Sequence, residues 1–260
     1  MSVPGRGTAV ALLLAGIAWP RAEVSAQSAA QAPRPAAALP SRSAPPGDVR
    51  QIVTFLLAPG GLERVQAIYT DSLRPIYASV PHIAQVRGYR EVESPEPLDL
   101  VIVTRYASMA AMDSANRAMR ALNTFALYGR ISALAQHHHD QFVAVDPTVS
   151  DPPRSDGTAS LTVFEYLRLA PGRTADFLAA LRTRVRSEER THPALVHSES
   201  GRLLVADGWD VLRMHTVESL GAWQRLLEAR WASTAARGAE SLVAARKVII
   251  VREDARLRVR

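Results

Sequence analysis

The stretch "LLAPGGLERV" at residues 56–65 decides the fold, because a close variant, "RLAPGRTADF", returns at residues 168–177. Both copies place an Ala-Pro-Gly turn between a run of alternating apolar residues and a helical pattern. Two further pairs of blocks follow in the same order: "LDLVIVTRYASMAAM" (98–112) with "WDVLRMHTVESLGAW" (209–223), and "QFVAVD" (141–146) with "VIIVRE" (248–253). Matched blocks in a constant order predict an internal duplication.

Each predicted unit has the order strand, helix, strand, strand, helix, strand. Apolar spacings of three and four predict a helix after each Ala-Pro-Gly turn, and Pro75 should kink the first of these helices or end its first part. Ser108 and Ser219 should cap the second helix of each unit. Apolar alternation places the strands near 50–57, 83–92, 98–106 and 141–146 in the first unit, and near 160–169, 194–205, 209–217 and 247–252 in the second.

This element order predicts an antiparallel sheet with both helices on one face. The other face also needs cover, because the strands are apolar on both phases: Leu100 and Ile102 alternate with Val101 and Val103. The simplest solution packs the two sheets against each other. The predicted fold class is therefore α+β, with two tandem ferredoxin-like βαββαβ units packed sheet to sheet as an intramolecular α/β barrel and the helices outside.

The strand ending in "APG" before an amphipathic helix, followed later by the strand, serine cap and helix of "RYASMAAM" and "HTVESLGAW", resembles the dimeric α/β-barrel superfamily. The resemblance covers about 48–146 and 158–253, and its motifs are structural. It implies kinship with cofactor-independent antibiotic-biosynthesis-type monooxygenases, stress-responsive barrels and haem-using enzymes such as chlorite dismutases. Most such proteins pair two single-unit chains, whereas this chain joins two units, as chlorite dismutases do. Membership of a fold does not by itself give a function.

The N-terminal segment has the pattern of a signal peptide. Arg6 precedes the apolar run "TAVALLLAGIAW", and "VSA" places small residues before Gln27. The apolar run is too short for a stable membrane anchor, so we expect cleavage after Ala26 and a periplasmic or secreted product without an anchor. The expected organisation is a signal peptide (1–26), a disordered Ala/Pro-rich spacer (27–47), the first unit (48–146), a linker (147–157), the second unit (158–253) and a basic, solvated tail (254–260).

Composition excludes several classes of protein. The chain of 260 residues has no cysteine, so an exported product cannot be held by disulfides and must rely on its core. Its formal charge of +6 comes almost entirely from arginines that are scattered among acids. Nucleic-acid binding is not expected, because the clustered basic patch that it needs is missing.

Comparison of the two units suggests where chemistry lies. On the third strand, Leu98, Leu100, Ile102 and Thr104 of the first unit correspond to Trp209, Val211, Arg213 and His215 of the second. Ile102 and Thr104 thus correspond to an arginine and a histidine, two residues apart and on one face. The first strand adds Glu165 or Tyr166, and the second strand adds His197. If these residues face the barrel interior, they form a polar ligand pocket lined by Tyr166, His197, Trp209, Arg213 and His215.

In that pocket Arg213 would hold an anionic or carbonyl oxygen, and His215 or His197 would act as an acid, base or ligand. The expected function is an exported barrel that binds a small apolar or aromatic molecule, with cofactor-independent monooxygenase-like chemistry by Arg213 and His215. One alternative is a non-catalytic structural or interaction barrel, with Arg213 and His215 outside a filled interior. A second is a haem-binding, chlorite-dismutase-like protein. No metal or other cofactor is expected, and a homo-oligomer is compatible with the fold.

The haem alternative needs a proximal histidine and a distal arginine from the second unit. His192, His197 and His215 are available, and no spacing singles one out. The other conspicuous histidines, "HHHD" at 137–140, have no counterpart in the second unit. Only His137 and His139 would share a face, which is too few ligands for a stable metal site. The sequence therefore favours a solvated connection into the final strand of the first unit.

Overall fold

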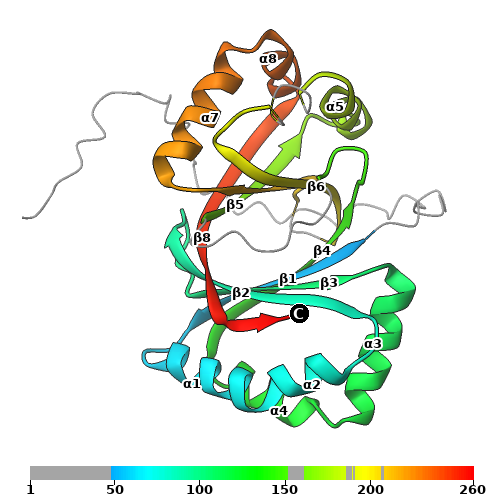
Figure 1. The fold of residues 1–260 in the computed structure, drawn as a ribbon, viewed down its shortest axis with the longest axis vertical. Helices are drawn as coiled ribbons and strands as arrows, with labels where there is room; N and C mark the ends of the chain where they lie inside the picture. The colour runs from blue at the N-terminus through cyan, green and yellow to red at the C-terminus, as the bar shows by residue number, and fades with distance from the viewer. Residues whose placement is uncertain (1–47, 152–160, 186–188, 190, 206–207) are drawn as a thin grey trace, which may run out of the picture. The chain divides into compact units, whose positions relative to one another are not determined.

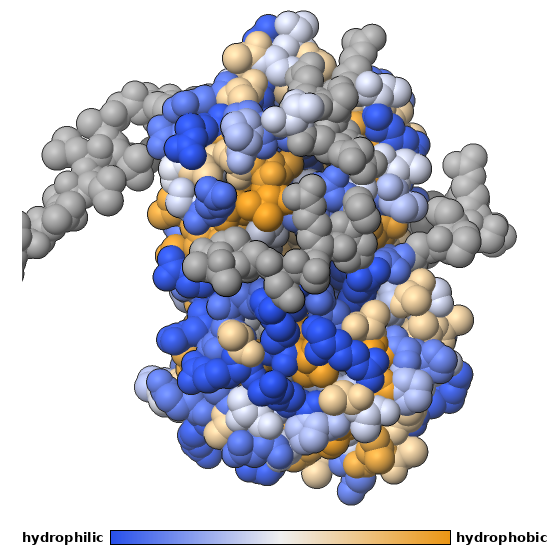
Figure 2. All heavy atoms as spheres, in the orientation of Figure 1, coloured by the Kyte–Doolittle hydropathy of each residue, from blue (hydrophilic) through white to orange (hydrophobic). Residues whose placement is uncertain are grey.

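The computed structural model describes residues 48–151, 161–185, 189, 191–205 and 208–260. The predicted signal peptide and spacer lie outside the described residues, as does most of the predicted linker. In the described part, no helix is long and apolar enough to cross a membrane. On the face seen in Figure 2, hydrophilic residues predominate and apolar ones form small groups between them.

Eight antiparallel strands close into one barrel in the order β1-β3-β2-β8-β5-β7-β6-β4 (Figure 1). The first half of the chain supplies four adjacent strands, β4-β1-β3-β2, and the second half supplies β8-β5-β7-β6. The strands are β1 (Val49–Leu57), β2 (Ile83–Glu93), β3 (Leu100–Tyr106), β4 (Ala135–Val145), β5 (Leu161–Leu169), β6 (Leu195–Val205), β7 (Val211–Val217) and β8 (Val243–Val259). The predicted α+β class and the barrel are confirmed, and the two halves join edge to edge through the β2–β8 and β4–β6 pairs.

Helices cover the outside of each half. In the first half they are α1 (Gly61–Ile68), the π-helical turn η1 (Tyr69–Leu73), α2 (Arg74–Ser79), α3 (Met109–Ala121) and α4 (Phe125–Ser132). In the second they are α5 (Thr174–Ala180), the π-helical turn η2 (Leu181–Val185), α7 (Leu220–Ala232) and α8 (Thr234–Glu240). The backbone stays helical through Pro75, and the change that precedes this residue is the π-helical turn η1, after which Pro75 stands in the first turn of α2.

Local chemistry fixes the same details in both halves. The Ser108 side chain accepts a hydrogen bond from Ala111 N at 3.1 Å and so caps α3, and Ser219 caps α7 in the same way. Asp99 and Asp210 also make the same contact, one in each half. Each carboxylate lies before the third strand of its half and accepts a hydrogen bond from the backbone N–H that ends the first strand, at 2.7 and 2.8 Å. The serine caps were predicted from sequence and are confirmed.

Alternation along the strands divides the core into layers. One phase fills the barrel interior with side chains from both halves, including Ile52, Val101, Phe164, Leu212 and Val251. The other phase packs under the helices of its own half. The barrel interior therefore holds an apolar core to which both halves contribute.

Glycines allow close contact at the two places where the halves join. At the β2–β8 junction, a Cβ on Gly88 would lie 2.4 Å from the Leu257 Cβ. At the β4–β6 junction, a Cβ on Gly201 would lie 2.4 Å from the Ala144 carbonyl oxygen. A side chain at either position would push the strands apart, so both junctions depend on glycine.

Two predictions about segment ends were wrong, because both closing strands are longer than the sequence suggests. The histidine run belongs to β4, where residues 137–144 pair with β1. The predicted solvated tail belongs to β8, which continues from β5 onto β2 and ends with Val259 opposite Val86. Leu257 and Val259 are buried in the first-half core, so the tail is a structural strand of the barrel.

Candidate functional site

Arg213 and His215 do not face the barrel interior, in contrast to the prediction. Their neighbours Val211 and Val217 on the same face of β7 pack under the helices, whereas Leu212 points into the barrel. Alternation shows which residues share a face but does not show which face lies inside. The five predicted site residues are consequently separated and do not line one pocket.

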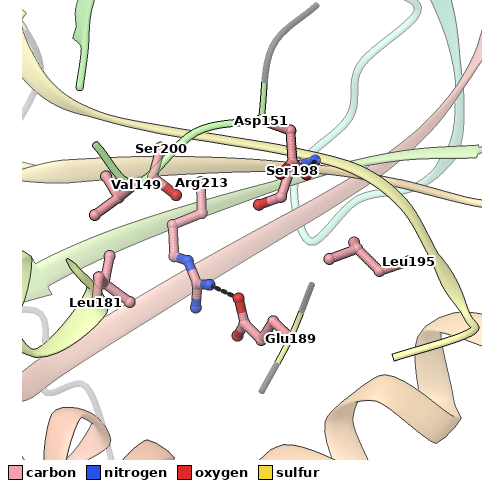
Figure 3. Close-up of a pocket in the computed structure, with 8 residues that line it drawn as sticks. All are labelled: Val149, Asp151, Leu181, Glu189, Leu195, Ser198, Ser200 and Arg213. Atoms are coloured by element: carbon pink, nitrogen blue, oxygen red, sulfur yellow. Dashed lines mark hydrogen bonds and ion pairs between the residues drawn. The ribbon is translucent and has the colours of Figure 1, made fainter. Parts of the chain in front are cut away.

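Arg213 and His215 belong instead to a buried ion-pair network between the second-half sheet and its helices. Figure 3 shows Arg213 reaching from β7 to Glu189, and the Nη2–Oε2 distance is 2.5 Å. Arg230 of α7 donates to Glu189 at 2.7 Å and to Glu165 at 3.2 Å. Glu165 is fully buried and also lies 3.0 Å from Arg246 Nε. The network cross-links β5, β7, α7 and β8.

Electrostatics keep these carboxylates charged. Burial alone would raise the pKa of Glu165. The positive charges of Arg230 and the neighbouring arginines outweigh this effect and hold the pKa of Glu165 well below its usual range. Burial alone would raise the pKa of Glu189, but the positive charges of Arg213 and Arg230 have the larger effect. The pKa of Glu189 therefore falls to about 2. Burial and the Arg230 charge together lower the pKa of His215 to about 4. The histidine is therefore neutral at pH 7.

The hydrogen bonds of His215 agree with this charge state. Arg230 Nη2 lies 2.8 Å from His215 Nε2, and because a guanidinium can only donate, Nε2 must accept. The proton then sits on Nδ1, which lies 3.1 Å from Ser198 Oγ. Both ring nitrogens are thus occupied, and the ring stacks on Trp223. This arrangement favours a structural role for His215.

We expect the free energy of unfolding to fall by about 2–3 kcal/mol as the pH is lowered from 6.5 to 4.5. The folded-state pKa of His215 lies below its unfolded value, so in this window only the unfolded chain takes up the proton, and stability falls with pH. Urea unfolding of the wild type and of His215→Gln at both pH values measures the effect. If the free energy of unfolding falls equally with pH in the two proteins, His215 does not cause the pH dependence.

The space beside Arg213 and His215 does not fit a haem. The cavity beside Arg213 and Glu189 is only about 10 Å³, and its side chains are committed to the ion pairs. His215 has both nitrogens engaged, and His192 Nδ1 lies 3.2 Å from the backbone nitrogen of Ala194. In the described part of the chain, no group of three or more His, Asp or Glu side chains is arranged to hold a metal ion.

Tyr166 and Trp209 lie at one open end of the barrel, which we call the histidine mouth. Their rings are 6.2 Å apart, and the ammonium of Lys247 lies over both. The rings of His137 and His139 stack at 6.4 Å in the same opening. The Tyr166 hydroxyl is already bonded to Gln141 at 2.7 Å. The remaining predicted residue, His197, lies at the opposite end of the barrel.

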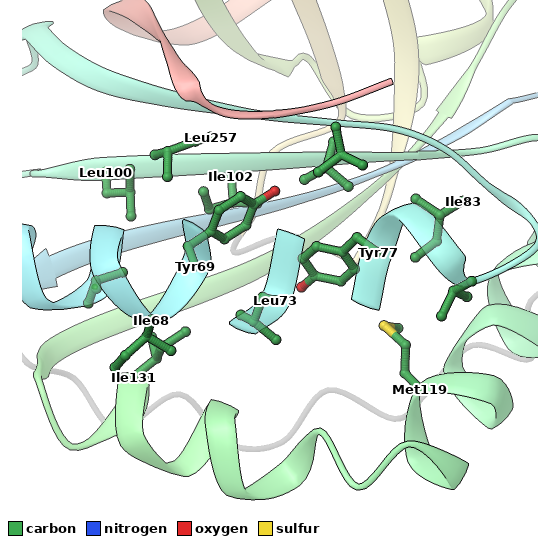
Figure 4. Packing of buried hydrophobic residues seen from close by; sticks show 14 of the residues in the cluster. Ile68, Tyr69, Leu73, Tyr77, Ile83, Leu100, Ile102, Met119, Ile131 and Leu257 are labelled. Atoms are coloured by element: carbon green, nitrogen blue, oxygen red, sulfur yellow. The ribbon is translucent and has the colours of Figure 1, made fainter. Parts of the chain in front are cut away.

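A further cavity lies in the first half, between the sheet and helices η1, α2, α3 and α4. Its volume is about 270 Å³. Figure 4 shows Tyr69 reaching from η1 toward the sheet, while the Tyr77 ring lies between the helical segments with Met119 nearby. Four of the chain's six tyrosines line this space, which we call the tyrosine cavity: Tyr69, Tyr77, Tyr106 and Tyr128. Apolar side chains form most of the remaining wall, among them Val53, Leu73, Leu100, Ile102 and Ile131.

One hydroxyl in the tyrosine cavity has no partner. Tyr77 and Tyr128 share a hydrogen bond at 3.1 Å, and Tyr106 donates to Gln51 at 3.2 Å. The Tyr69 hydroxyl is buried and has no hydrogen-bond partner among the described residues. Burial raises the pKa of Tyr69, so its hydroxyl stays protonated and can donate. A buried polar group without a partner is costly and suggests a missing ligand or water.

A polar rim opens the tyrosine cavity to solvent. Gln51 accepts from Tyr106 and donates to Asp140 at 2.9 Å, and His138 lies 3.8 Å from the other Asp140 oxygen. His138 and Asp140 are both partly exposed. The histidine run thus contributes to two openings, since His138 and Asp140 point to the cavity while His137 and His139 point to the barrel mouth. The sequence interpretation missed this contribution.

Comparisons with known proteins support the fold. No family model matches the chain, and no curated protein matches it. A "putative monooxygenase" from Lactobacillus acidophilus superposes with a TM-score of 0.58 at 8% identity, covering 82% of this chain and 96% of that one. Another from Fusobacterium nucleatum gives 0.60 at 10% identity, covering 80% and 92%. Chlorite dismutase from Candidatus Nitrospira defluvii gives 0.55 at 11% identity, covering 81% and 92%. At these identities the likeness shows a shared α/β-barrel fold and nothing of function.

Proposed function

We propose that the protein binds a small apolar or aromatic molecule in the tyrosine cavity. The observation that carries this proposal is the buried, unpartnered Tyr69 hydroxyl in a largely apolar space of about 270 Å³. A ligand that offers a carbonyl or ether oxygen to Tyr69 would satisfy that donor while its rings contact the aliphatic wall. Binding sites for small molecules commonly combine an apolar wall with a few placed polar groups in this way.

The volume limits the size of the ligand. An apolar cavity of about 150 Å³ holds one benzene molecule, so the tyrosine cavity suits one or two fused rings. The polar rim at Gln51, His138 and Asp140 would accommodate a hydrophilic substituent on the far side of the ligand. We therefore propose a mono- or bicyclic ligand with an oxygen acceptor at its enclosed end.

Replacing Tyr69 with phenylalanine should weaken the binding of 1-tetralone, a bicyclic ketone, by about three- to tenfold, because one neutral hydrogen bond is lost. Tetralin lacks the carbonyl, so its affinity should not change. Isothermal titration calorimetry measures both. The matched control is Tyr166→Phe in the histidine mouth, which should bind 1-tetralone like the wild type. Equal loss in both variants, or none in Tyr69→Phe, would contradict the assignment.

Oxygenation of the bound molecule by the cofactor-independent route is the reaction class that we propose to test, on the analogy of the monooxygenase-named neighbours. The tyrosine cavity would enclose the ligand, and the Tyr106–Gln51–Asp140 chain of hydrogen bonds would hold the Tyr106 hydroxyl in place at its wall. The rival function is a non-catalytic barrel, favoured by the apolar core inside the barrel and by the engagement of Arg213 and His215 in ion pairs. Binding of 1-tetralone without turnover of any phenolic analogue would favour that rival.

We also propose that the chain consists of two fused ferredoxin-like units and is exported after cleavage of residues 1–26. The paired Asp99 and Asp210 contacts and the paired serine caps support the duplication. Export rests on the sequence pattern of the N-terminal segment.

A further inference from the structure

We infer that the end of the barrel opposite the histidine mouth is a binding site for a small oxyanion. We call it the arginine end. It is lined by Arg50, Gln85, Arg87, Tyr89, Val103, Arg105, Thr162, His197, Glu199, Met214 and Thr216. It shares no lining residue with the tyrosine cavity, so the inference stands apart from the proposed function.

The strand register places polar side chains in two rows at this end. In the first half Arg50 pairs with Arg105 across β1 and β3, and Arg105 pairs with Gln85 across β3 and β2. In the second half Thr162 pairs with Thr216 across β5 and β7, and Thr216 pairs with His197 across β7 and β6. Neighbouring strands lie about 4.8 Å apart. Hydrogen-bond donors from six strands therefore border one small opening.

Two buried donors at the arginine end have no acceptor among the described residues. They are Arg50 Nη1 and Arg87 Nε. Arg50 is 4% exposed, and its other nitrogens hold Glu199 in a bidentate pair at 2.6 and 3.0 Å. Its Nη1 lies 3.6 Å from Asp48, beyond hydrogen-bond distance. Unsatisfied donors of this kind favour an acceptor that comes from outside the chain.

Charge and size point to an oxyanion. The lining carries three guanidinium groups and one carboxylate, Glu199, whose pKa is about 2 because the nearby His197 and Arg50 outweigh the effect of its burial. The carboxylates that pair with Arg105 and Arg87, Asp48 and Glu253, do not line the opening. The space is about 60 Å³, roughly the volume of two water molecules. Guanidinium groups bind the oxygens of carboxylates and phosphates with matching geometry.

Calorimetric titration of the full chain with acetate, phosphate and nitrate, each against chloride at constant ionic strength, tests the inference. The wild type should bind at least one of the three. Arg87→Gln should bind it about tenfold more weakly, because it loses a charged donor. Arg90→Gln removes an exposed arginine from the same strand and should bind like the wild type.

Two results would overturn the inference: none of the three oxyanions binds the wild type, or Arg87→Gln and Arg90→Gln bind as tightly as the wild type. If Arg87→Gln does not fold, Arg105→Gln replaces it, since this change removes another guanidinium from the same opening. Its affinity for the same oxyanion should fall, and an unchanged affinity would count against the site.

Discussion

Replacing Glu165 with glutamine is expected to lower the free energy of unfolding by about 3–5 kcal/mol, the cost of leaving buried charges without their partner. Glu165 is fully buried and faces Arg230, Arg213 and Arg246 at 3.2, 3.7 and 3.0 Å. A neutral amide cannot balance these cations, and it also brings N–H donors toward other donors. Urea unfolding at pH 7 provides the measurement.

The control for Glu165→Gln is Glu96→Gln. Glu96 pairs with Lys247 at 3.2 Å but is largely exposed, so its loss should cost at most about 1 kcal/mol. A similar cost for both substitutions would mean that the buried network contributes no more than a surface ion pair, and our account of the second half would be wrong.

Replacing Val53 with tryptophan should weaken the binding of 1-tetralone at least about a hundredfold, because the indole occupies the space that the ligand needs. Val53 lies on β1 and lines the tyrosine cavity. Since the side chain enters a cavity and not a packed core, the change in stability should stay within about 2 kcal/mol. Calorimetry gives the affinity, and urea unfolding gives the stability.

The neighbouring residue provides a matched control. Thr54 points to the other face of the same strand and lines the histidine mouth. Thr54→Trp should therefore leave 1-tetralone binding unchanged. The opposite pattern, with binding lost in Thr54→Trp and kept in Val53→Trp, would move the ligand site to the barrel mouth.

Local sequence signals were sufficient for the element order and the barrel. Alternation, the Ala-Pro-Gly turns and the Ser108 and Ser219 caps act over a few residues, so they can be read without knowing the partner strand. The ends of β4 and β8 could not be read in this way. Their polar residues are held by pairing with β1 and β2, and that pairing depends on contacts between distant parts of the chain.

The site that we propose lies in the other half from the residues that the sequence singled out. The comparison of the units was used to find polar residues gained in the second unit, and it led to Arg213 and His215. A search for polar residues that only the first unit has would point to the tyrosines. Tyr69 stands where the second unit has Leu181, and Tyr106 stands where it has Val217. Even so, sequence could not show that the Tyr69 hydroxyl lacks a partner, because that depends on how the helices pack on the sheet.

The central claim is that the tyrosine cavity of the first half holds a small ligand against Tyr69. A crystal structure of the protein soaked with 1-tetralone tests it most directly. We predict density for the bicyclic ketone between β1 and η1, with its oxygen within hydrogen-bond distance of the Tyr69 hydroxyl. Density in the histidine mouth beside Trp209, with an empty tyrosine cavity, would contradict the account.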